Sequence, residues 1–176
     1  MPRPAITALL WGGDKRSIGR SNEVVRLVLS RPSRFRELIT CLWSEDPVIC
    51  LRAADAAEKI SARTPALLRP FKRELLGLLA EAQQQELRWH LAQIVPRLEL
   101  TVRERERAAN AFRLFLEDRS SIVKTCAIQA LAELSAQDRS LHREVLGLLE
   151  EALKTGTPAM KARARNLIGS FRAGSR

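Results

Sequence analysis

The feature of this sequence that most limits its fold is a pattern that recurs about every 37 residues. Cys50, Arg88, Lys124 and Lys161 occupy equivalent positions in four ungapped segments, at spacings of 38, 36 and 37 residues. Repeats of this length are supersecondary units that stack on their neighbours, because one unit alone cannot bury its apolar face. The sequence therefore predicts a stacked array.

Each unit is predicted to contain two helices. Around the equivalent positions, apolar residues lie three and four apart, which places them on one stripe of a helix. A second amphipathic segment precedes each of these, beginning in the first unit with Phe35 and Leu38. Asp46-Pro47 separates the two segments of that unit, and Pro is well placed in the first turn of a helix. The connections are short, so paired helices must be antiparallel neighbours.

Composition favours the same fold class. Leu and Ala supply 27 and 23 residues, whereas Tyr is absent, and both common residues are strong helix formers. The prediction is an all-α fold, an α–α superhelix of about four helical hairpins, in a single domain over residues 1–176. The hairpins are expected at 31–62, 65–98, 101–135 and 138–172, with residues 1–30 as an N-terminal helical cap.

The pattern of Asp46-Pro47, an aliphatic–basic pair and then Ala-Ala-x-Ala resembles a HEAT repeat. The resemblance covers roughly residues 31–172, and armadillo and phycobilin-lyase-type repeats are similar. It implies a solenoid in which the second helix of each hairpin lines a concave face. Cys50 departs from the pattern, because HEAT-type repeats carry a basic residue there. A ladder of basic residues between neighbouring units is therefore expected to begin at Arg88.

A polar residue recurs five positions after the basic one, as Asp55, Gln93, Gln129 and Asn166. One interpretation is structural: Arg88, Lys124 or Lys161 bonds such an acceptor on the adjacent unit, since half-buried cations need partners. The other interpretation is a polar stripe on the concave face. The candidate partner-binding residues of that face are Leu51, Asp55, Trp89, Gln93, Thr125 and Gln129.

Trp89 has two interpretations as well. It lies one step from the repeated basic position, beside the apolar stripe, where it either anchors a partner or packs at the rim of the core. His90 has no second ligand at metal spacing, and His142 lies two units away. The sequence therefore predicts no metal site and no histidine-based catalysis.

The formal net charge of +10 is concentrated at the two ends. Residues 1–36 and 154–176 each carry +6, whereas residues 37–153 carry −2. The ends are either polar caps or sites for a polyanion. The candidate anion-binding residues are Lys15, Arg16, Arg20, Lys161, Arg163 and Arg165. The first three belong to a Gly-rich loop over 12–21, which lacks the spacing of a Walker motif and is either a phosphate cradle or a plain connection.

Other features narrow the class of protein. Cys41, Cys50 and Cys126 form no CxxC pair, which favours reduced thiols in a cytoplasmic protein. No apolar run has the length of a membrane span, and Ala5–Trp11 is too short for a signal peptide. We therefore expect no membrane partner, no cofactor and no enzymatic activity.

These observations predict a non-enzymatic scaffold that binds a macromolecule, a protein in the first instance, through the concave face. Nucleic-acid binding is the alternative, since HEAT-like repeats also build the alkylation-repair DNA glycosylases, although this chain is shorter than those enzymes and their catalytic motif has no match in it. The resemblance to phycobilin lyases adds a third class, a lyase-like chaperone. The sequence predicts neither the identity of the partner nor the oligomeric state.

Overall fold

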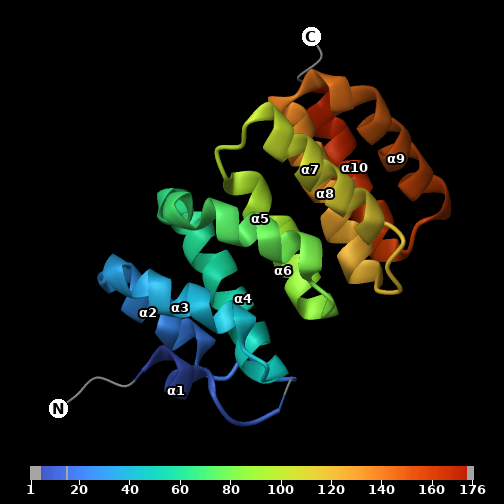
Figure 1. The fold of residues 1–176 in the computed structure, drawn as a ribbon. Helices are drawn as coiled ribbons and strands as arrows, with labels where there is room; N and C mark the ends of the chain where they lie inside the picture. Colours follow the sequence, from blue (N-terminus) through green and yellow to red (C-terminus); the bar gives the residue numbers. More distant parts are fainter. Residues whose placement is uncertain (1–4, 15, 174–176) are drawn as a thin grey trace. The chain divides into compact units, whose positions relative to one another are not determined.

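The computed structural model describes residues 5–14 and 16–173, with side chains as far as Phe171. Every regular element in these ranges is a helix, so the fold is all-α, as predicted (Figure 1). The chain divides into two compact units, Met1–Leu98 and Glu99–Arg176. The division falls between the second and third predicted hairpins.

Two helices form the N-terminal cap, α1 (Ile6–Leu10) and α2 (Ser21–Ser30). They pack on each other and on α4 (Pro47–Arg63), and α1 also contacts α3 (Phe35–Thr40). The backbone N–H of Ile6 donates to Oε1 of Glu37 over 2.5 Å, which ties the first turn of α1 to α3. The predicted N-terminal helical cap is therefore present as α1 and α2, packed against the first hairpin.

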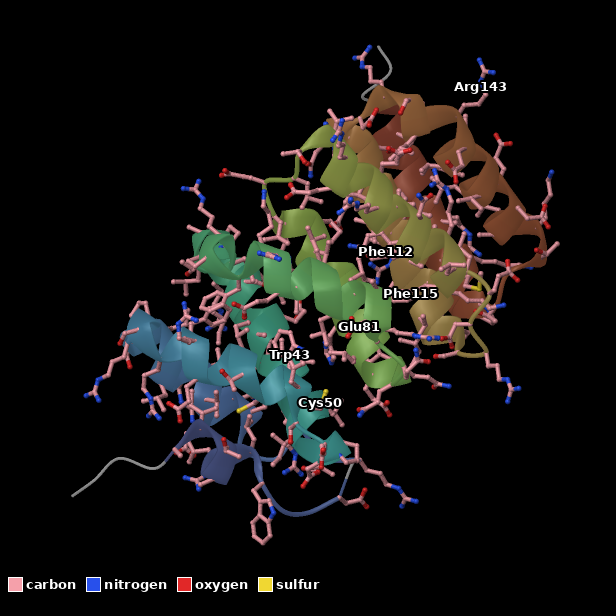
Figure 2. All side chains as sticks on the ribbon, in the orientation of Figure 1. Trp43, Cys50, Glu81, Phe112, Phe115 and Arg143 are labelled. Atoms are coloured by element: carbon pink, nitrogen blue, oxygen red, sulfur yellow. The ribbon has the colours of Figure 1, made fainter. Side chains whose placement is uncertain are left out.

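The first hairpin consists of α3 and α4, joined through a short 3-10 turn at Cys41–Trp43. Helix α4 begins at Pro47, where Oδ1 of Asp46 accepts hydrogen bonds from the N–H groups of Val48 (2.8 Å) and Ile49 (3.4 Å). This cap satisfies backbone donors that the helix cannot bond internally. Figure 2 shows Cys50 on α4 and Trp43 on the preceding turn.

The second hairpin contains α5 (Lys72–Glu81) and α6 (Gln85–Ile94). A 3-10 segment at Pro65–Phe71 precedes it, and α6 packs along α4. Arg97, just beyond α6, bonds Oε1 of Glu58 on α4 over 2.6 Å and the Oγ atom of Ser61 over 2.7 Å. These bonds fasten the end of the second hairpin to the first.

The second unit contains the third and fourth hairpins, built from α7 (Val102–Phe115), α8 (Ser121–Gln137), α9 (His142–Thr155) and α10 (Pro158–Ala173). Helix α8 packs against the other three. The four predicted hairpins therefore exist, and in each unit the second helices of successive hairpins pack together.

One contact links the two hairpins of the second unit, and another joins the two helices of its fourth hairpin. Arg113 on α7 donates to both carboxylate oxygens of Glu144 on α9, each over 2.6 Å. The ring of His142, at the start of α9, stacks on that of Phe171 in α10 with centroids 4.5 Å apart. Both contacts join residues distant in sequence, so periodicity alone does not reveal them.

Candidate interaction surfaces

Arg52 organises the loop between α1 and α2. Arg52 lies on α4 and is only 3% exposed, although its side chain is charged. Its guanidinium donates to the carbonyl oxygens of Leu10 (2.8 Å), Ser17 (3.1 Å), Asp14 (3.2 Å) and Gly12. We call residues 11–14 and 16–20 the clamped loop. Its carbonyl groups converge on one buried cation.

Glycine is required where the clamped loop passes the guanidinium. Gly12, Gly13 and Gly19 all have positive φ, at 85°, 83° and 51°. A Cβ atom on Gly19 would lie 2.7 Å from Cζ of Arg52, closer than carbon atoms pack. The loop therefore needs Gly19 for both its backbone conformation and its proximity to Arg52.

Two apolar side chains of the clamped loop are exposed. Trp11 is 71% exposed and Ile18 is 44% exposed. Exposed aromatic and aliphatic side chains on a held loop are a feature of interaction sites. Helix α1 ends at Leu10, so Trp11 belongs to the loop that follows it.

Asp55 on α4 connects the cap to the first hairpin. It accepts hydrogen bonds from the Oγ atom of buried Ser21 and, over 2.7 Å, from the Nζ atom of Lys59. Lys59 also donates to Oδ1 of Asn22 over 2.9 Å. Asp55 therefore serves to dock α2 on α4, one turn along the same helix from Arg52.

Trp89 and Gln93 lie on α6, on the side away from the buried residues Leu87 and Leu91. Both are half-buried, as is Leu51 on α4. The Nε2 atom of Gln93 donates to the carbonyl oxygen of Trp89 over 3.2 Å. Leu51, Trp89 and Gln93 thus occupy two packed helices of one unit, as the repeat alignment predicts.

His90 is the buried neighbour of Trp89, with its ring centroid 5.7 Å from that of Trp89. Burial lowers the pKa of His90, while Asp55, Glu58 and Glu86 act in the opposite direction. Among the residues that the structure describes, none bonds its buried Nδ1 atom. His90 is therefore held neutral in the core.

The remaining two predicted partner-binding residues belong to α8 of the second unit. Thr125 is buried, and its hydroxyl donates to the carbonyl oxygen of Ser121 over 2.6 Å. Gln129 is half-buried and donates to Oε1 of Glu133 on the same helix over 2.6 Å. Thr125 therefore offers little surface to a partner, because only 8% of it is exposed.

Three of the acceptors expected in the ladder between repeats have other hydrogen-bond partners. The acceptor Asp55 is bonded by Ser21 and Lys59, and Gln93 and Gln129 bond within their own helices. The Nε atom of Arg88 donates to the carbonyl oxygen of Ala82, over 2.8 Å. The sequence alignment alone cannot reveal these bonds.

The anion-binding residues predicted near the N-terminus are Lys15, Arg16 and Arg20, and Lys15 lies outside the described residues. Arg20 forms a two-bond ion pair with Glu23, with both N–O distances 2.9 Å. The backbone N–H groups of Arg16 and Ser17 bond Asp14. These internal bonds occupy donors that a phosphate would otherwise use.

The other predicted anion-binding group is on α10. Arg163 and Arg165 are exposed and Lys161 is half-buried. Residues 154–176 contain no acidic side chain, and no ion pair is formed by these three cations with the described residues. They therefore give α10 an uncompensated positive surface.

The described residues show no grouping of side chains suited to metal or thiol chemistry. In the described part of the chain, no three His, Cys, Asp or Glu residues are grouped as a metal site. Cys41 and Cys50 are buried, and burial raises the pKa of the Cys50 thiol to about 11. Over the described residues, no helix is long and apolar enough to cross a membrane.

Comparison with known proteins gives no relative: no protein-family model, curated protein or solved structure matches this chain.

Proposed function

We propose that this chain is a non-enzymatic helical scaffold of the HEAT-repeat type that binds a protein through α4 and α6 of its first unit. Trp89 carries the proposal. Its indole is only half-buried, and it lies on the side of α6 turned away from the buried residues Leu87 and Leu91. Partly exposed tryptophan is the residue type that most often dominates protein–protein binding energy.

The neighbours of Trp89 support this role. Leu51 and Asp55 lie half-buried on α4, which packs along α6, and Gln93 lies one turn from Trp89 on α6 itself. Asp55 and Gln93 already have intramolecular partners, so they arrive at an interface pre-ordered and lose little further side-chain entropy. We place the protein in the cytoplasm, where its thiols stay reduced.

A substitution of Trp89 tests the proposal. The variant Trp89→Ala should capture less protein from native cells while its unfolding midpoint changes little. Trp43→Ala is the matched control, because Trp43 is 46% exposed in the same unit but lies on the turn before α4. Unchanged capture by Trp89→Ala, or a loss shared equally by Trp43→Ala, would refute the proposal.

Nucleic-acid binding is the second candidate function, and the positive surface of α10 favours it. Cationic side chains without acidic neighbours bind phosphates by releasing counterions, so such binding weakens steeply as salt rises. A gel shift with duplex DNA at low salt tests this directly. Joint replacement of Lys161, Arg163 and Arg165 by Ala should abolish the shift. Absence of a shift by the unaltered chain at low salt would remove this candidate.

A further inference from the structure

We propose that the clamped loop docks on an anionic lipid surface, with Trp11 and Ile18 entering the interface. The surface is separate from the α4–α6 face, and it requires no membrane-spanning helix. The proposal rests on three observations: the shape of the loop, the exposure of its apolar side chains, and the positive charge of the N-terminal segment.

The shape follows from Arg52. The carbonyl groups of Leu10, Gly12 and Ser17 all meet one guanidinium. Leu10 and Gly12 flank Trp11, and Ser17 precedes Ile18. The guanidinium therefore holds the backbone next to both apolar residues. The two apolar side chains therefore belong to one small, inwardly bonded loop, and they are exposed rather than folded into its centre.

The apolar side chains are of the type that lipid interfaces accept. Tryptophan is enriched at membrane interfaces, because its ring is apolar while its N–H remains able to bond water or headgroups. Ile18 adds purely apolar surface. Pre-organisation by Arg52 matters, since a loop already held in shape loses less conformational entropy on docking.

The positive charge of the N-terminal segment is the third observation. Residues 1–36 contain eight basic and two acidic side chains. Arg26, on α2, is exposed, and so is Arg16 on the clamped loop, although its Nε atom lies 4.0 Å from Oδ2 of Asp14. Stable attachment to a lipid surface takes two signals, and an apolar insertion with basic residues in the same segment provides both. A pocket in a partner protein would receive the same side chains but does not require this positive excess, which is why we favour the lipid.

Vesicle sedimentation tests the proposal with the full chain. The probes are vesicles of phosphatidylcholine and phosphatidylserine in equal parts, and vesicles of phosphatidylcholine alone. The chain should sediment with the anionic vesicles, less so at high salt, and weakly with the neutral ones. Joint replacement Trp11→Ala and Ile18→Ala should weaken binding about tenfold or more, while Trp43→Ala, which alters a tryptophan outside the loop, should bind like the unaltered chain.

Fluorescence gives an independent reading that does not depend on the folding of the double variant. Anionic vesicles should shift the emission of the unaltered chain to shorter wavelength, and Trp11→Phe should abolish the shift. The proposal is overturned if the chain sediments with neither kind of vesicle, if the double variant binds as tightly as the unaltered chain, or if the shift persists in Trp11→Phe. Capture of a protein through Trp11 without vesicle binding would also overturn it.

Discussion

Gly19 lies against the guanidinium of Arg52 so closely that a Cβ atom on Gly19 would sit 2.7 Å from Cζ of Arg52. This contact connects two residues 33 positions apart in the sequence. Gly19 allows the loop to come close to Arg52. The guanidinium of Arg52 can then donate hydrogen bonds to the carbonyl groups of the loop. The N-terminal cap is therefore fixed to α4 by polar contacts as well as by apolar packing.

Gly19→Ala should lower the free energy of unfolding by about 1–3 kcal/mol, because Gly19 has φ of 51° and the new Cβ meets Arg52. Gly77→Ala is the control. Gly77 lies inside α5 with open space around it, so alanine there should leave stability unchanged or raise it by about 0.5–1 kcal/mol. Urea unfolding of both variants measures the difference, and equal effects would contradict the contact.

Arg52→Met should lower the free energy of unfolding by about 3 kcal/mol, because it removes the donors of one buried and three part-buried hydrogen bonds to carbonyl groups. Hydrogen exchange should accelerate at the amides of residues 16–21, which lose their fixed loop. Arg63→Met, an exposed change in the last turn of the same helix, should alter neither quantity. Unchanged exchange in the loop of Arg52→Met would show that the guanidinium does not hold it.

His90 should make the first unit less stable in mild acid. Burial lowers its pKa in the folded chain, so the unfolded chain, with an ordinary pKa of about 6.5, binds the proton first as the pH falls. Stability should therefore decline as the pH drops below about 6.5. His90→Leu should remove this decline and keep or raise stability at neutral pH, since it eliminates a buried unbonded nitrogen. A pH profile of thermal unfolding that is identical in the variant contradicts this account.

Glu144→Gln should weaken the second unit only slightly, by about 0.5 kcal/mol, because the side chains of Arg113 and Glu144 are 35% and 37% exposed and solvent screens them. The hydrogen bonds from Arg113 lower the pKa of Glu144. The stabilisation is therefore present above the ordinary Glu pKa and lost as the pH falls through the lowered value. Glu150→Gln, exposed on the same helix, is the control. Equal losses in the two variants would show that the pair contributes nothing.

Periodicity was sufficient to predict the helices. The breaks at Asp46-Pro47 and Thr101 coincide with caps, because Asp and Thr side chains satisfy the first N–H groups of α4 and α7. Apolar stripes placed both helices of every hairpin, since burial is a property of each helix face. The sequence pattern therefore predicted where each of these helices lies and which helix it pairs with in its hairpin.

The contacts of polar side chains could not be predicted in this way. Arg52 was not singled out, because it stands two positions from the repeated basic site, and only the loop that reaches it explains its burial. Asp55 was assigned to a ladder or a surface stripe, yet Ser21 and Lys59 bond it. A signal was available in the sequence: Gly12, Gly13 and Gly19 cluster in this loop, and all three have positive φ in the structure.

The central claim is that α4 and α6 present a protein-binding face around Trp89. A photo-cross-linking amino acid placed at position 89, and for comparison at the exposed position 73 on α5, tests it most directly in native cells. The account predicts a discrete protein adduct from position 89 and none from position 73. Adducts of equal yield at both positions, or none at position 89, would contradict it.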